Sequence, residues 1–329
     1  MNWWLTFAGL IVGVVVGMTG MGGGALMTPI LVIFFGIQPL AAVSSDLVAA
    51  AIMKPVGSVV HLRRGTVNLA LVKWLCIGSV PCAFAGVFVA KAIGPGARVN
   101  DVIQFVLGIA LLVASASLIV KAYLSMLERA RRRADGVSDD TDYTAAPVVD
   151  VHILRTVAIG AIGGLLVGMT SVGSGSLIII ALIAVYPRLQ PSSLVGTDLV
   201  QAVPLVASAA LAHVLFGDFH LGITVSLLIG CLPGVYLGAT LSSRVPGGII
   251  RRALAFVLLA SGLKLLDFSN FTTVVILVVV VVVGPPVWMW LRHRHGFPPL
   301  ASQEQAGDDR PDTVELPAGS DPGDRRPES

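Results

Sequence analysis

The chain has 329 residues, of which 55% are hydrophobic and only 12% are charged. This charged fraction is about half of what a soluble globular domain carries, which excludes a soluble fold and indicates a membrane protein. The net charge of +3 is small and spread over loops, so nucleic-acid binding, which needs a clustered basic face, has no support. We expect lipid and a small solute as partners.

Long apolar windows follow one another along the chain and predict membrane helices. They lie at 3–18, 25–36, 44–60, 70–90, 102–121, 154–169, 176–187, 194–214, 221–242, 251–266 and 271–291. Several are near 20 residues long, enough to cross about 30 Å of hydrocarbon as helix. The pattern predicts an all-α, polytopic membrane protein.

Two of these windows, 25–36 and 176–187, are too short to be ordinary spans. Each follows a glycine-rich break, Gly20–Gly24 in the first case and Val172–Ser176 in the second. Short, interrupted helices at matching positions are typical of secondary transporters.

The charged segments outline the domain organisation. Residues 122–152 hold a basic run and then an Asp-rich stretch, a composition that predicts a flexible cytoplasmic linker. This linker separates a first transmembrane repeat (1–121) from a second (153–267). An extra transmembrane helix (268–292) and a disordered cytoplasmic tail (293–329) follow.

The two halves repeat each other at an offset of 151–152 residues. The first break, GMTGMGGGAL at 17–26, matches GMTSVGSGSL at 168–177. Further on, Gln38-Pro39, Asp46, His61, Gly65 and Pro81 match Gln190-Pro191, Asp198, His213, Gly217 and Pro233. The chain therefore contains an internal repeat.

Basic residues predict how the halves lie in the membrane. If each short helix and the helix before it leave and return on one side, fifteen Lys and Arg are cytoplasmic and three, Lys91, Arg98 and Lys264, are outside. The positive-inside rule then places the N-terminus outside, and the linker and the tail in the cytoplasm. An odd number of crossings per half makes the repeats inverted, as in many secondary transporters. We expect the chain in the inner, or plasma, membrane.

The glycine breaks are the strongest candidate binding site. A helix that begins near Gly24 or Gly175 presents backbone N–H groups and the positive end of its dipole, both of which suit an anion. Inverted repeats would bring both helix starts to one central site. The predicted substrate-binding residues in the breaks are Thr19, Gly22, Gly23, Gly24, Thr170, Gly173, Ser174 and Gly175. The alternative is that the glycines only permit close helix packing.

Ionisable residues inside apolar windows are the second signal, because charges in a bilayer are costly. Lys54 has no counterpart in the second half, where Val206 is aligned, and a lone cation would suit an anionic substrate. It could instead snorkel or pair with another residue. Lys54 lies eight residues after Asp46, about 12 Å along a helix, so the two should not pair directly. Asp46 and Asp198 could relay a proton, or they could cap helices.

His61 and His213 occupy matching ends of matching windows. They could take part in proton coupling, or they could be interfacial histidines that bind loop backbone. No cluster of metal ligands surrounds either, and we expect no metal and no cofactor.

These stretches resemble the TauE/SafE sulfite-exporter family of bacterial transporters, also described as the toluene-sulfonate uptake permease family. The residues that carry the resemblance are TGMGGGALMTPIL, TSVGSGSL, SSDLVAAAIMKPVGSVVHLRRGTVN and GTDLVQAVPLVASAALAHVLFGDFH. The resemblance covers nearly all of 3–266. It implies export or uptake of sulfite, sulfonates or related sulfur-containing organic anions.

The sequence thus predicts a secondary transporter of small anions, since no nucleotide-binding P-loop is present. One alternative is a passive anion channel. A less favoured alternative is an intramembrane enzyme, because neither HExxH nor GxSxG occurs. The chain could also form a homo-oligomer.

Overall fold

The computed structural model describes residues 3–19, 24–63, 67–92, 97–134, 151–186, 189, 191–241 and 247–294. In these ranges the chain forms helices and no strand, so the all-α prediction is confirmed. The helices are α1 (Trp3–Thr19), α2 (Gly24–Phe35), α3 (Pro39–Arg63), α4 (Leu69–Ala92), α5 (Ala97–Ala134), α6 (Ile153–Thr170), α7 (Leu177–Val185), α8 (Pro191–Phe216), α9 (Leu221–Leu241), α10 (Gly247–Leu265) and α11 (Asn270–Arg294).

Six stretches of these helices are long and apolar enough to cross a membrane. They are Leu69–Ala92, Arg98–Leu124, Ile153–Thr170, Ser193–Phe216, Leu221–Gly238 and Asn270–Leu291. Trp3–Met18 and Gly24–Phe35 are shorter apolar helices. The predicted polytopic membrane protein is therefore confirmed, and the short α2 and α7 follow the two glycine-rich breaks as expected.

The flexible linker expected from residue 122 is wrong for its first part. Helix α5 continues to Ala134, so 122–134 is helical. This stretch is rich in Ala, Leu, Met, Glu and Arg, which are strong helix formers, and Met126 is buried. A charged run that extends an existing helix needs no separate nucleation step. The prediction of a flexible linker from composition alone did not take this into account. Residues 135–150 lie outside the described part.

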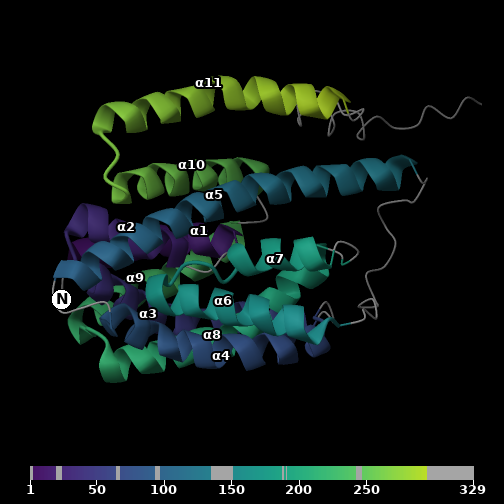
Figure 1. Ribbon diagram of the computed structural model, residues 1–329. Helices are drawn as coiled ribbons and strands as arrows, with labels where there is room; N and C mark the ends of the chain where they lie inside the picture. The colour runs from purple at the N-terminus through teal and green to yellow at the C-terminus, as the bar shows by residue number, and fades with distance from the viewer. Residues whose placement is uncertain are drawn as a thin grey trace, which may run out of the picture. The chain divides into compact units, whose positions relative to one another are not determined.

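Close packing of glycines joins helices from different halves. A Cβ atom on Gly164 of α6 would lie 2.7 Å from Ser79 Cα of α4, and one on Gly234 of α9 would lie 3.0 Å from Val14 N of α1. Neither pair leaves room for a side chain, so small residues are what let α6 approach α4 and α9 approach α1. Figure 1 shows α6 beside α4.

Equivalent helices of the two halves run in opposite directions. In the α3–α8 pair, Ser44 contacts His213 near one end, and Ser58 contacts Leu199 near the other, so the two helices are antiparallel. Helices α5 and α10, which lie side by side in Figure 1, are antiparallel by the same reasoning. Gln104 there bonds to Leu265, and Ser115 bonds to Ala255. This geometry supports inverted repeats; the side of the membrane that each end faces stays a prediction.

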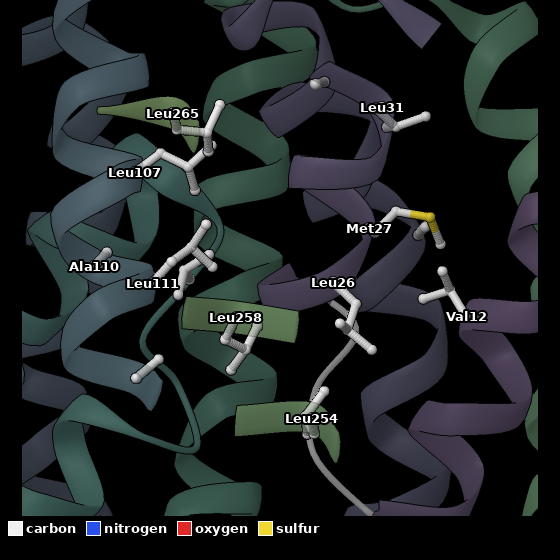
Figure 2. Packing of buried hydrophobic residues seen from close by; sticks show 14 of the residues in the cluster. Val12, Leu26, Met27, Leu31, Leu107, Ala110, Leu111, Leu254, Leu258 and Leu265 are labelled. Carbon is white, nitrogen blue, oxygen red and sulfur yellow. The ribbon is translucent and has the colours of Figure 1, made fainter. Parts of the chain in front are cut away.

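Two hydrophobic clusters bury the apolar faces. One joins α1, α2, α3, α5, α9 and α10, and its members labelled in Figure 2 are Val12, Leu26, Met27, Leu31, Leu107, Ala110, Leu111, Leu254, Leu258 and Leu265. The other joins α3, α4, α5, α6, α7 and α8, with Leu47, Leu71, Leu75, Ile103, Leu182 and Leu205 among its fully buried members. Each cluster draws on both halves of the sequence, which holds the repeats together.

The chain divides into a unit of residues 1–280 and a unit of residues 281–329. The boundary falls within α11, which has Pro285 and Pro286 inside it. Most α11 side chains are exposed, among them a run of valines. An exposed apolar helix of this length suits a lipid environment.

Candidate functional site

The second glycine break is an unwound turn between α6 and α7. Helix α6 ends at Thr170, and Ser171 follows with φ 61°, its N–H bonded to Val167 O at 2.7 Å. Gly173 and Gly175 have φ of 129° and 107°, values that favour glycine because it has no Cβ. The predicted interruption is thus present in the second half. Gly20–Gly23 of the first break, including the predicted site residues Gly22 and Gly23, lie outside the described residues, as does the Thr19 side chain.

The N-terminus of α7 differs from our expectation. We expected its first N–H groups to be open to a ligand, but those of Ser176, Leu177 and Ile178 all point at Gly173 O, at 3.1–3.4 Å. One carbonyl oxygen therefore caps the start of α7.

The open donors are instead in the turn itself. The successive N–H groups of Gly173, Ser174 and Gly175 donate no hydrogen bond within the described part of the chain. Gly173 is buried, and Ser174 and Gly175 are half-buried. Successive N–H groups in a turn that contains positive φ values form a concave nest that binds anions.

Lys54 reaches this turn from α3. Its ammonium group donates a hydrogen bond to Ser174 Oγ, and the side chain is only 8% exposed. The lysine therefore does not snorkel to an interface. Among the described residues no carboxylate lies within 4.0 Å of it, although Asp198 and Asp46 are near enough to interact with its charge. The structure places Lys54 beside the nest.

Asp198 of α8 lies on another side of the same turn. A Cβ on Gly175 would be 3.7 Å from Asp198 Oδ2, so the carboxyl group is next to the open N–H groups. Gln201 holds the other oxygen through an Nε2–Oδ1 contact of 3.4 Å and accepts a hydrogen bond from Ser79 of α4 at 3.1 Å. Asp198 is 1% exposed.

Asp46 of α3, the repeat counterpart of Asp198, lies where the two breaks meet. Thr28 Oγ1 of α2 donates to Asp46 Oδ2 at 2.6 Å, and Ser171 lies beside the carboxyl group. A Cβ on Gly24, the first residue of α2, would be 2.8 Å from Ser171 Oγ. The start of α2 thus packs directly on the second break, and Gly24 is close to the Ser171–Gly175 turn as predicted.

The suggestion that the aspartates cap helices is wrong. Asp46 and Asp198 each lie two turns inside their helix, because α3 begins at Pro39 and α8 at Pro191. Proline is well suited to the first helical position, where its missing N–H would have no partner. The matching Gln-Pro pairs were the better signal for the helix starts.

His213 is wholly buried rather than interfacial. Its Nε2 lies 2.7 Å from Gly168 O, and its Nδ1 lies 2.8 Å from Ser44 Oγ. Because a carbonyl can only accept, Nε2 carries a proton. The ring joins α8 to α3 and to the last turn of α6, just before the break. The His61 side chain is outside the described residues.

Several polar residues of this region were not predicted from the sequence. Thr28, Ser44 and Gln201 are all buried and hold or adjoin the predicted residues. Each is a polar side chain inside or beside an apolar window, which was the only available signal.

Thr170 was predicted as a ligand, but its hydroxyl bonds to Leu166 O at 2.7 Å and Val172 O at 3.2 Å, so it stabilises the helix end.

The model of the family described as "Sulfite exporter TauE/SafE" matches residues 5–265, which cover α1 to α10. The chain belongs to the TauE/SafE family. The match ends before α11, so the extra C-terminal helix is an addition to the TauE/SafE core.

Three relatives from Bacillus subtilis (strain 168) agree with this assignment. "Probable membrane transporter protein YjnA" is 37% identical over 259 residues, 78% of this chain and 97% of the relative. "Probable membrane transporter protein YdhB" is 25% identical, covering 78% and 96%. "Probable membrane transporter protein YunE" is 23% identical, covering 80% and 96%. No solved structure matches the chain. The TauE/SafE chain described here is therefore a multi-pass membrane transporter.

Proposed function

We propose that this protein is a secondary transporter of small anions, with sulfite, sulfonates and related sulfur-containing organic anions as its substrate class. The observation that carries the proposal is the nest of three open N–H groups at Gly173–Gly175 with the buried Lys54 ammonium beside it. Buried backbone donors without partners are rare in folded proteins, and of the three residues Gly173 is buried while Ser174 and Gly175 are half-buried. Here an anion would satisfy all of them together.

The chemistry of the site suits a sulfur oxyanion. Such an anion offers several acceptor oxygens, which can bind successive N–H groups while another faces a cation. Lys54 supplies the cation as a point charge and needs no fixed planar geometry. The glycines leave the backbone uncovered, so the anion can approach it closely.

The opposite directions of equivalent helices support a carrier mechanism. In inverted-repeat transporters the site lies between the halves, and access alternates from one membrane side to the other. We propose that α2, α7 and the breaks before them form such a site, with the linker and the tail in the cytoplasm. The same arrangement favours transport over an enzymatic role.

Flux measurements on reconstituted protein test this proposal. Proteoliposomes would be given labelled sulfite or a labelled sulfonate together with imposed proton or sodium gradients, and accumulation against the anion gradient is expected. Flux that only dissipates the anion gradient would show the channel alternative to be correct. Absence of any anion flux from folded protein, with both gradients and both anions tested, would contradict the proposal.

Lys54→Ala should lower anion transport at least tenfold, because removal of one charge-assisted contact costs about 1.5–3 kcal/mol. Lys91→Ala is the matched control, since Lys91 is an exposed lysine in the last turn of α4. Wild-type flux and affinity in a well-folded Lys54→Ala protein would remove Lys54 from the binding site.

A further inference from the structure

We propose that Asp46 and Ser171 form a sodium-binding site that couples Na⁺ to anion transport. The inference rests on the proposed function, since a coupling ion has meaning only in a transporter. It adds a ligand that the anion site itself does not require. The site lies where α2 and α3 of the first half meet the glycine break of the second half.

Two buried oxygens at this place have no partner. Asp46 Oδ1 and Ser171 Oγ make no hydrogen bond, although Asp46 is 0% and Ser171 6% exposed. The two groups are neighbours. An unpartnered carboxylate oxygen inside a membrane protein is costly unless something neutralises it.

The surrounding groups orient the carboxylate for a cation. Thr28 Oγ1 donates to Oδ2, which leaves Oδ1 free to bind a ligand. Helix α6 ends immediately before Ser171, and the C-terminal end of a helix carries partial negative charge. The C-terminal ends of broken helices hold the coupling ion, Na⁺ or H⁺, in other inverted-repeat folds.

The charge balance of the site also favours a cation when an anion is bound. Two buried carboxylates interact with two ammonium groups: Asp46 with that of Lys54, and Asp198 with those of Lys54 and Lys121. With all four ionised their charges sum to zero, and a bound anion makes the site negative. One monovalent cation at Asp46 offsets the charge of the bound anion, which is a physical reason for the two solutes to be coupled.

The donor set favours Na⁺ over other cations. Carboxylate and hydroxyl oxygens are hard ligands, and the described residues hold no cluster of three acidic, His or Cys side chains that would suit a divalent metal.

Thermal unfolding of the purified full-length protein tests the site without any anion substrate. Melting temperatures would be measured in NaCl, KCl and choline chloride at equal ionic strength and constant pH. A ligand that binds only the folded state raises the melting temperature as its concentration exceeds its Kd. A saturable increase specific to Na⁺ is expected for wild type. Asp46→Asn should abolish it, and Ser171→Ala should raise the half-saturating Na⁺ concentration at least tenfold.

Ser193→Ala is the control, because Ser193 is another buried serine with no hydrogen-bond partner, and it should retain the wild-type Na⁺ response.

If Asp46→Asn does not fold, Ser171→Ala decides the question. Equal stability in Na⁺, K⁺ and choline, or an undiminished Na⁺ response in the variants, would overturn the site. Stabilisation by lower pH in place of Na⁺ would also overturn it. A retained Na⁺ response with no anion flux would contradict the proposed function only.

Discussion

His213 shows at the residue scale how buried polar groups fix the geometry next to the break. Its ring lies between Ser44 of α3 and Gly168 of α6. Ser44 Oγ is also 2.8 Å from Leu40 O, and since the hydroxyl has one hydrogen, it can donate to only one of these neighbours at a time. The ring thereby ties the last turn of α6 to α3.

His213→Ala should destabilise the protein by about 1–3 kcal/mol, because Gly168 O loses its donor and a buried cavity is created. The melting temperature in detergent measures the effect. His220→Ala is the control, since His220 is exposed and precedes α9. Equal melting temperatures for the two variants would show that the His213 contacts contribute nothing to stability.

At the scale of elements, the α4–α6 and α1–α9 pairs depend on small residues. Lipid tails are as apolar as a leucine side chain, so moving an apolar side chain from lipid into a helix–helix contact gains no hydrophobic free energy. Close van der Waals contact between the helices has to hold them together instead. Gly164, Gly230 and Gly234 each allow one backbone to touch the next. Glycines that look unfavourable in a helix in isolation are therefore favourable in these pairs.

Gly164→Leu should force α6 away from Ser79 of α4 and lower the melting temperature by several degrees, since overpacking costs about 1–3 kcal/mol or more. Gly222→Leu in α9 is the matched control, because nothing lies within 4 Å of a Cβ there. If both substitutions leave the melting temperature unchanged, the close approach of α4 and α6 is not required for stability.

At the scale of the whole molecule, the inverted arrangement of the halves can be tested by labelling. The C-terminal ends of α3 and α8 should lie on opposite membrane sides, because these helices are antiparallel. Arg63→Cys and Asp218→Cys would be made separately in a background without Cys76, Cys82 and Cys231.

A membrane-impermeant maleimide added outside intact cells should label the cysteine at 218 and not the one at 63. In inside-out vesicles the pattern should reverse. Labelling of both positions from one side would contradict the inverted model.

The sequence by itself determined the membrane class, the internal repeat and the order of the helices. Hydropathy is a local property, and a repeated run such as GMTGMGGG and GMTSVGSG can be read directly from the letters. It also singled out Lys54 and the two aspartates, because a charged residue in an apolar window is conspicuous.

Only the tertiary structure decided what these residues touch. Lys54 meets Ser174 across 120 residues of sequence, Asp46 meets Thr28 rather than capping α3, and His213 is buried rather than interfacial. The open N–H groups belong to the turn at Gly173–Gly175 and not to the start of α7. Such contacts depend on how helices from two halves pack together, and hydropathy and spacing along one chain carry no information about that packing.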